Sequence, residues 1–201
     1  MEKNGVKIKV LFLDFDGVIT HPGSKWNVDP EKVKLLEKII EDTGAKIVVS
    51  SSWSVGCKNA EQFIERDFSG YFKNKTTEIT RDSLFIQSII DVTDHMGSAR
   101  GDEIKRWLEA HEDKVESYVI LDDDGDMLEE QLFNFVQTDG WYGMSDRTVY
   151  LATKVLNNEK ITNPIRLNQE LLLKWRLNIS KIQENNIYQL MLDYEHRFKN
   201  N

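Results

Sequence analysis

Four stretches of the chain consist mostly of apolar residues and then turn polar, which is the pattern of buried strands. They span residues 6–13, 45–53, 117–126 and 134–139. In the first stretch the apolar residues barely alternate with polar ones, as is typical of a strand buried on both faces. Residues 84–91 suit either a further strand or a short helix. We therefore predict a sheet whose strands lie in the interior of the protein.

Between these stretches the apolar residues recur at three- and four-residue spacing, which predicts amphipathic helices. The helix at 29–44 has the expected ends, with Asp29 as N-cap, Pro30 in the first turn and Gly44 as C-cap. A second well-marked helix is predicted at 98–113. Shorter helical segments are predicted at 59–68 and 127–132, and the pattern of 72–81 is ambiguous.

The alternation of strands and helices predicts the fold class. It favours an α/β protein, a Rossmann-like three-layer α/β/α sandwich in which helices cover both faces of a parallel sheet. We assign residues 1–157 to this core. Residues 158–201 read as one or two further helices, a C-terminal helical extension that we expect to pack against the core or a partner chain. A homo-oligomer through these helices is one expectation.

Three of the predicted strands end in polar clusters. Asp14 and Asp16 follow the first strand, serines occupy 50–52 after the second, and 122–126 holds four aspartates after the third. Right-handed crossovers bring the carboxyl ends of parallel strands to one edge of the sheet, where ligands bind in such folds. We therefore expect the three clusters to line one pocket.

Composition and charge narrow the choice of partners. The net charge of −8 argues against a broad nucleic-acid surface, because phosphate-binding surfaces are usually basic, but it leaves a short strand end open. Cys57 is the single cysteine, so no internal disulfide can form and a reducing compartment is expected. The first ten residues do not resemble a signal peptide, and no apolar run is long enough to span a membrane. These features predict a cytoplasmic protein.

Carboxylates at neighbouring strand ends form the oxygen-rich kind of site that Mg²⁺ prefers. Beside such a metal, one carboxylate can attack phosphorus and form an aspartyl-phosphate. A second carboxylate can protonate the leaving oxygen and then activate water. Asp14 is the candidate nucleophile and Asp16 the candidate acid and base. Asp122, Asp123 and Asp126 are candidates to complete the metal shell.

Phosphoryl oxygens also need hydroxyl and positive groups around them, because negative charge must be stabilised there. Ser51, at the end of the second strand, can donate a hydrogen bond to such an oxygen. Either Arg100 or Lys105, in the predicted helix at 98–113, can neutralise it.

The stretches "FLDFDGV", "VVSSSW", "RGDEIKRWL" and "YVILDDDGD" resemble the four motifs of the haloacid dehalogenase (HAD) phosphatase superfamily. Within it, "SSSW", "RGDEI" and "LDDD" are most similar to the compact HAD domains grouped with Swiss-Army-knife RNA repair proteins. The resemblance runs from about residue 7 to 156 and includes 138–156, where that group often has a glycine-containing turn and a helix. It does not account for 158–201.

The resemblance implies a role for each matching residue. Asp14 would attack the phosphate, and Asp16 would act as acid and base while its backbone carbonyl faces Mg²⁺. Ser51 and Ser52, the two positions before the tryptophan, would bind the phosphate, and Arg100 resembles the cation of the third motif. Lys105 is the alternative cation. The residues implied for the metal are Asp14, Asp16, Asp122, Asp123 and Asp126.

The same residues admit other interpretations. A calcium-binding EF-hand starting at Asp122 would need glycine and glutamate where Met127 and Phe133 stand. A phosphorelay receiver domain would place its phosphorylated aspartate after a later strand. Trp53 could stack on a base or sugar, whereas Trp107, Trp141 and Trp175 are better explained as core or interface aromatics.

The spacing between the motifs predicts a minimal cap. About 13 residues separate Asp16 from Asp29, and about 48 lie between Ser51 and Arg100, part of which must form a core helix and strand. A nearly uncapped site favours large substrates or closure by a partner subunit.

We therefore expect a Mg²⁺-dependent phosphohydrolase that works through an aspartyl-phosphate, with a phosphorylated nucleotide or nucleic-acid end as its favoured substrate. The alternatives are a phosphatase of a small metabolite or phosphoprotein, and a non-catalytic interaction module on the same fold.

Overall fold

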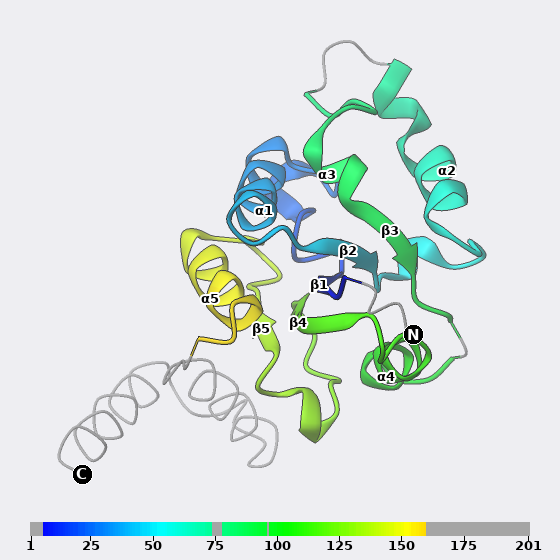
Figure 1. Ribbon diagram of the computed structural model, residues 1–201. Coiled ribbons are helices and arrows are strands. Elements are labelled where there is room, and N and C mark those ends of the chain that lie inside the picture. Colours follow the sequence, from blue (N-terminus) through cyan, green and yellow to red (C-terminus); the bar gives the residue numbers. More distant parts are fainter. Residues whose placement is uncertain (1–5, 74–77, 96, 160–201) are drawn as a thin grey trace, which may run out of the picture.

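The computed structural model describes residues 6–73, 78–95 and 97–159. In this part of the chain, five parallel strands form one sheet in the order β3-β2-β1-β4-β5 (Figure 1). The strands are β1 (Ile8–Leu13), β2 (Lys46–Val49), β3 (Ile89–Val92), β4 (Val115–Asp122) and β5 (Phe135–Gln137).

Helices connect the strands as the sequence pattern predicts. They are α1 (Pro30–Thr43), α2 (Ala60–Lys73), α3 (Leu84–Ser88), α4 (Arg100–Ala110) and α5 (Asp146–Leu156), with short 3₁₀ turns η1 (Pro22–Ser24), η2 (Ser52–Ser54) and η3 (Glu129–Gln131). Residues 84–91, predicted as a strand or a short helix, contain both, because α3 leads directly into β3. The short helix predicted at 127–132 is the single turn η3.

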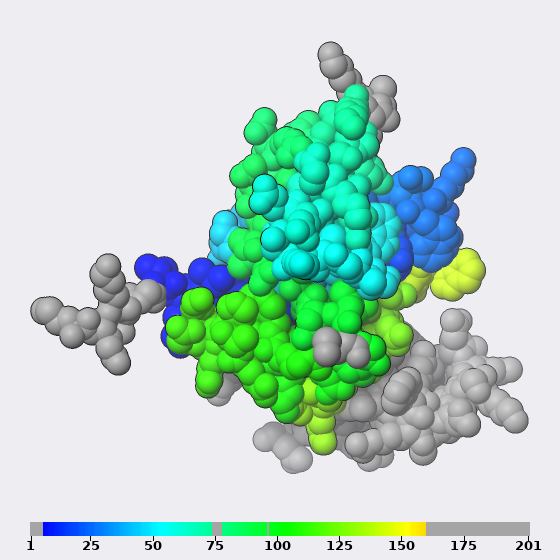
Figure 2. All heavy atoms as spheres, turned by 90° about the vertical axis from the view of Figure 1, so that its right-hand side faces the viewer, coloured from blue at the N-terminus to red at the C-terminus, as the bar shows by residue number. Residues whose placement is uncertain are grey.

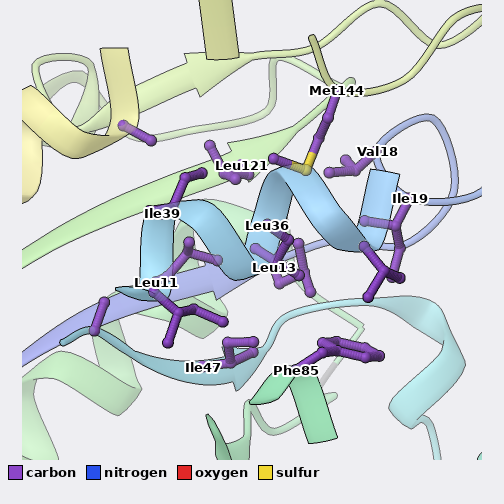
Figure 3. Close-up of a cluster of buried hydrophobic side chains, with 14 of the residues drawn as sticks. Leu11, Leu13, Val18, Ile19, Leu36, Ile39, Ile47, Phe85, Leu121 and Met144 are labelled. Atoms are coloured by element: carbon purple, nitrogen blue, oxygen red, sulfur yellow. The ribbon is translucent and has the colours of Figure 1, made fainter. Parts of the chain in front are cut away.

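The predicted three-layer sandwich is confirmed by the two faces of β1. Leu11 and Leu13 point into a large core with side chains of α1, α2, α3 and α5. Figure 3 shows both leucines in this core with side chains of α1 and α3. Val10 and Phe12 point to the other face, where they meet Trp107 of α4. The last four residues of β1 are therefore buried on both faces of the sheet, which explains why this part of the strand is continuously apolar.

The ends of α1 are those that the sequence predicts. The Asp29 side chain accepts a hydrogen bond from the backbone N–H of Glu31, and Pro30 occupies the first turn. Gly44 ends the helix with a φ of 70°, a left-handed conformation that glycine adopts at little cost.

The register of the sheet aligns the polar strand ends. Leu13, the last residue of β1, is paired with Val49 of β2 and with Leu121 of β4. Beyond it, the backbone N–H of Asp14 donates to the carbonyl of Leu121 at 2.9 Å. The residues that follow β1, β2 and β4 therefore lie side by side at one edge of the sheet, as predicted.

The minimal cap is also confirmed in the described residues. The segment between β1 and α1 contains only the turn η1, and the segment between β2 and α4 contains η2, α2, α3 and β3. Figure 2 shows the face on which the surfaces of α2 (cyan) and α4 (green) lie next to each other. The C-terminal extension, with any oligomer contact it makes, lies outside the described residues, as does Trp175. None of the described helices combines the length and apolar character needed to cross a membrane.

Candidate active site

Three carboxylates meet at the carboxyl edge of the sheet. Asp14 follows β1, Asp122 ends β4 and Asp123 comes next. One oxygen atom of each lies within 4.8 Å of the others. Asp14 is 6% and Asp122 2% exposed, so little water is available to stabilise their charges. Such a group of carboxylates strongly favours the proximity of a cation.

Burial changes the protonation of these carboxylates. It raises the pKa of Asp14 from 3.8 to about 7, although Arg100 and a hydrogen bond from Ser51 oppose the shift. Burial and the charge of Asp14 raise the pKa of Asp122 to about 8. The pKa of Asp123 is also raised, mainly by burial. Without a metal, the cluster therefore binds protons tightly near neutral pH.

The donor set fits Mg²⁺. All three side chains offer carboxylate oxygens, which hard divalent cations prefer. The Oδ2 atom of Asp122 is buried and accepts no hydrogen bond in the described part of the chain; its ion-pair partner there is Nε of Arg100 at 3.4 Å, so it has lone pairs left to bind a cation.

Two glycines make room for Asp123. A Cβ atom built on Gly17 would lie 2.2 Å from the carboxyl carbon of Asp123, and one on Gly140 would lie 2.4 Å from its Oδ2 atom. Gly17 also has a φ of 73°, which a residue with a side chain rarely adopts. Glycine at both positions therefore allows the carboxylate of Asp123 to point into the site.

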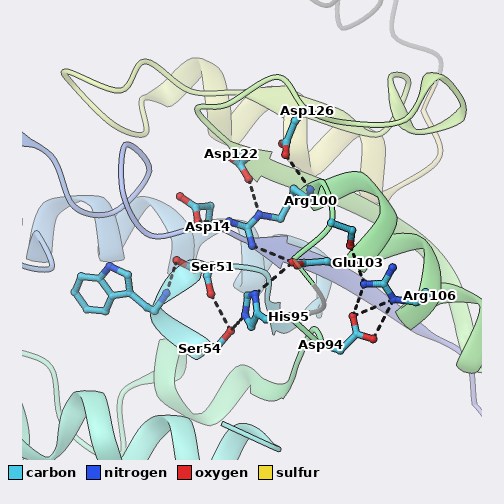
Figure 4. Close-up of polar contacts among 12 residues, drawn as sticks. Asp14, Ser51, Ser54, Asp94, His95, Arg100, Glu103, Arg106, Asp122 and Asp126 are labelled. Carbon is cyan, nitrogen blue, oxygen red and sulfur yellow. Dashed lines mark hydrogen bonds and ion pairs between the residues drawn. The ribbon is translucent and has the colours of Figure 1, made fainter. Parts of the chain in front are cut away.

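Arg100 is the cation that the structure brings to the carboxylates (Figure 4). Its Nη2 atom lies 3.5 Å from Oδ1 of Asp14, and its Nε atom lies 3.4 Å from Oδ2 of Asp122. The structure places Lys105 elsewhere, in an exposed ion pair with Glu130 at 3.1 Å. Five residues along a helix correspond to about 7.5 Å of rise and a rotation of about 140°, so the two side chains leave α4 on different faces.

Asp126 and Asp16, both predicted at the metal, make other contacts through their side chains. Asp126 accepts a hydrogen bond from the backbone N–H of Arg100 at 2.9 Å and so caps α4. The Asp16 carboxylate accepts hydrogen bonds from Thr20 Oγ1 at 2.7 Å and from Trp53 Nε1 at 3.1 Å. Neither side chain belongs to the group of three carboxylates. A metal contact through the backbone carbonyl of Asp16 stays a prediction.

The serines after β2 differ in burial. Ser51 is fully buried, and its side chain hydrogen bonds to Asp14. Ser52, the first residue of η2, is exposed. The structure therefore brings the Ser51 hydroxyl, together with Arg100, to the candidate nucleophile.

Two residues at the site were not assigned their contacts from the sequence. Thr20 and Trp53 each donate a hydrogen bond to Asp16, and Trp53 also packs on Phe15 with ring centroids 5.1 Å apart. From its position directly after the serines, the sequence suggests a role for Trp53 in stacking on a base or sugar. Its indole N–H instead fixes the orientation of the candidate acid and base.

The two described tryptophans expected in the core or at an interface differ in burial. Trp107 is buried in the core, whereas Trp141 is 74% exposed, which excludes the core for Trp141, and its role as an interface aromatic stays a prediction. Trp141 follows Gly140, which contacts the carboxylate of Asp123. The residue that carries the exposed indole therefore directly follows one that lies against Asp123 of the carboxylate group.

A comparison with protein families finds one match that covers most of the chain. Residues 10–149 match the family described as the HAD domain in Swiss Army Knife RNA repair proteins. The matched range contains β2 to β5, β1 from Val10 onward, and the three carboxylates. Neither the curated proteins nor the solved structures include a match to this chain.

Proposed function

The chain belongs to the family of HAD domains found in Swiss Army Knife RNA repair proteins, and from this premise we propose that it is a Mg²⁺-dependent phosphohydrolase acting through an aspartyl-phosphate. The fold and the acidic cluster are those of HAD-type phosphohydrolases in general. As substrates we propose phosphorylated nucleic-acid ends or nucleotides.

One observation carries the proposal: the candidate nucleophile, a hydroxyl, a guanidinium and two further carboxylates converge at the end of β1. Ser51 and Arg100 both contact Asp14, the residue from which an attack on phosphorus would start. Asp122 and Asp123 complete a set of oxygen ligands. When bound, Mg²⁺ would supply positive charge that keeps these carboxylates ionised and withdraws charge from a phosphoryl oxygen.

The residues of the chain suit two successive displacements. In the first, an Asp14 oxygen forms a bond to phosphorus, the bond to the leaving oxygen breaks, and Asp16 donates a proton to that oxygen. In the second, Asp16 takes a proton from water, which attacks phosphorus and releases phosphate and the Asp14 carboxylate. Ser51 and Arg100 are placed to stabilise the charge on the phosphoryl oxygens.

The hydrogen bonds of Asp16 support its role. Thr20 and Trp53 donate to its two oxygens, so its carboxyl group is held in one orientation. Asp16 is also more exposed than Asp14, which suits a group that must exchange protons with water and a leaving oxygen. The different surroundings of the two carboxylates therefore suit Asp14 to be the nucleophile and Asp16 to carry the proton.

The surroundings support a nucleotide or strand end as substrate. The minimal cap leaves the site open to a large leaving group. Trp141 is 74% exposed and follows Gly140, which lies against the carboxylate of Asp123, so it offers a flat apolar surface on which a base can stack. The net charge of −8 disfavours long polyanions, so a short end is preferred over an extended strand or duplex.

The test is a panel of phosphorylated compounds assayed with Mg²⁺, with Asp14→Asn as the blank. It includes oligonucleotides phosphorylated at either end, mononucleotides, sugar phosphates and a phosphoserine peptide. We expect turnover of the nucleotide substrates and none with Asp14→Asn. Activity that survives in Asp14→Asn would contradict the mechanism, and a preference for sugar phosphates or the peptide would contradict the substrate class.

Trp141→Ala tests the role of the exposed indole. Loss of a stacked base typically costs 1–3 kcal/mol, so we expect kcat/KM to fall about tenfold on a mononucleotide and to stay unchanged on a sugar phosphate. Tyr150→Ala is the matched control, because Tyr150 is 56% exposed on α5, where Lys154 lies over its ring. An equal loss on both substrates would show that Trp141 does not contact a base.

A further inference from the structure

Glu103 is a buried carboxylate that the proposed reaction does not use. It lies three residues after Arg100 on α4 and is 4% exposed. A buried carboxylate is unfavourable unless positive or hydrogen-bonding groups face it. Two such groups face its Oε2 atom, Nη1 of Arg100 at 3.4 Å and Nδ1 of His95 at 3.4 Å. Glu103 thus contacts the guanidinium of Arg100 on the side away from Asp14 (Figure 4).

His95 connects Glu103 to the turn that carries Ser51. The Nε2 atom of His95 lies 2.7 Å from the hydroxyl oxygen of Ser54, and that hydroxyl is 2.8 Å from the carbonyl oxygen of Ser51. A carbonyl can only accept, so the single hydroxyl proton points to Ser51 and Nε2 of His95 must be the donor. In the neutral ring Nδ1 of His95 then carries no proton, and it donates to the Glu103 carboxylate only in the imidazolium form, in which both nitrogens are protonated.

The contacts link a serine, a histidine and a carboxylate in the order of a catalytic triad: Ser54, His95 and Glu103. These three residues cannot act as a triad. Ser54 is fully buried, so no substrate can reach its hydroxyl. Its proton is already donated to the Ser51 carbonyl rather than to His95. The contacts therefore serve to hold residues in place.

We propose that Glu103 is a positioning residue for Arg100 and that His95 holds Glu103 in turn. Arginine is long and flexible, and the carboxylates of Asp14 and Asp122 both attract it when they are ionised. A third anionic contact at Glu103 limits how far the guanidinium can move toward either aspartate. The inference rests on the proposed function, since it concerns the cation that faces the phosphate.

The contacts also set the distance between the two phosphate-binding elements. Ser51 follows β2 and Arg100 begins α4, and along the chain these elements are separated by η2, α2, α3 and β3. The path Ser51–Ser54–His95–Glu103–Arg100 joins them through side chains (Figure 4). Catalytic groups must be held to within a fraction of an ångström for phosphoryl transfer, and such a path supplies that restraint.

Glu103→Gln separates positioning from simple electrostatics. Removing a negative charge near an anion site by itself strengthens phosphate binding, because a repulsion is lost. Loss of positioning weakens phosphate binding, because Arg100 no longer points at the phosphate. The two explanations therefore predict changes of opposite sign.

The probe is inorganic phosphate in the presence of Mg²⁺, with binding measured by calorimetry on the full chain and kcat/KM measured on the substrate found in the panel. We expect Glu103→Gln to raise the Kd for phosphate about fivefold and to lower kcat/KM about tenfold. In an Arg100→Ala background the same substitution should change neither quantity, because its effect passes through Arg100. His95→Ala should show a smaller loss that disappears in the Glu103→Gln background.

Asp94→Asn is the matched control. Asp94 precedes His95 in the chain. It forms an exposed ion pair at 2.8 Å with Arg106, which lies on α4 as Glu103 does. The substitution Asp94→Asn removes one negative charge from the same region without touching Arg100, so phosphate binding should be unchanged or slightly tighter. If Glu103→Gln fails to fold, Glu103→Asp keeps the charge but cannot reach both partners, and the same losses are expected.

The outcomes distinguish this inference from the proposed function. Phosphate binding that tightens or stays constant in Glu103→Gln, or that weakens equally with and without Arg100, overturns the positioning role while the phosphatase activity stands. Coupling between Glu103 and Arg100 in phosphate binding, together with no turnover of any compound by the wild type, overturns the activity and supports the positioning role.

Discussion

Asp14→Asn should stabilise the metal-free protein at alkaline pH while it abolishes activity. Burial raises the pKa of Asp14 from 3.8 to about 7, and burial with the charge of Asp14 raises that of Asp122 to about 8. The folded state thus binds these protons more tightly than the unfolded state. This stabilisation is complete below pH 3.8 and is lost as the pH rises through about 7 and 8.

The magnitude follows from the pKa values. The folded and ordinary values for Asp14 differ by about three, and each pKa unit corresponds to about 1.4 kcal/mol, so ionising Asp14 costs at most about 4 kcal/mol of stability. Asparagine has nearly the same volume and no charge, and it removes the repulsion that raises the pKa of Asp122. We expect Asp14→Asn to be about 2 to 4 kcal/mol more stable than the wild type at pH 9, and the difference to shrink by about half at pH 5.

Urea denaturation followed by circular dichroism, with EDTA at both pH values, measures this difference. Mg²⁺ should stabilise the wild type more than the variant at pH 9, because the ion binds the ionised carboxylates of the folded state. Asp113→Asn serves as control, since Asp113 is exposed and a surface substitution should change stability by less than about 0.5 kcal/mol. Lower stability of Asp14→Asn than of wild type at pH 9 in EDTA would refute the reasoning.

Two further substitutions test the geometry of the site. Gly140→Ala puts a Cβ 2.4 Å from the flexible end of Asp123, so the fold should persist while the Kd for Mg²⁺ in a calorimetric titration rises about tenfold. Gly70→Ala, in α2 with nothing within 4 Å of the new Cβ, should leave Mg²⁺ binding unchanged, and equal Kd values for both variants would contradict the role of Gly140. Arg100→Met should lower kcat at least a hundredfold, and Lys105→Met should leave it within about twofold. The reverse ranking in a steady-state assay would assign the phosphate cation to Lys105.

Much of the fold could be predicted because it depends on short-range patterns. The apolar stretch of β1 and the caps of α1 at Asp29 and Gly44 are set by residues adjacent in the chain. The alternation of strands and helices then leaves few topologies, since crossovers between parallel strands are right-handed. The convergence of Asp14 and Asp122 followed from the same rule.

The boundaries of elements and the placement of single side chains were harder to predict from the sequence. Residues 84–91 carry a pattern that suits a strand or a helix, and packing of α3 against α1 and of β3 against β2 divides them between both. Tryptophan has a large apolar side chain that suits a core, but Trp141 lies in the loop between β5 and α5, where its side chain is exposed. Short apolar segments are decided by their neighbours in space.

The sequence by itself determined the fold class and the chemical type of the site, because strand ends and carboxylate pairs are formed by residues that lie close together in the chain. Only the tertiary structure decided which side chains meet. It brought Arg100 rather than Lys105 to Asp14, because a rotation of about 140° along α4 separates the two cations. It also joined Glu103 to His95, which come from different elements. Such pairings depend on how elements pack in three dimensions, and no local pattern encodes them.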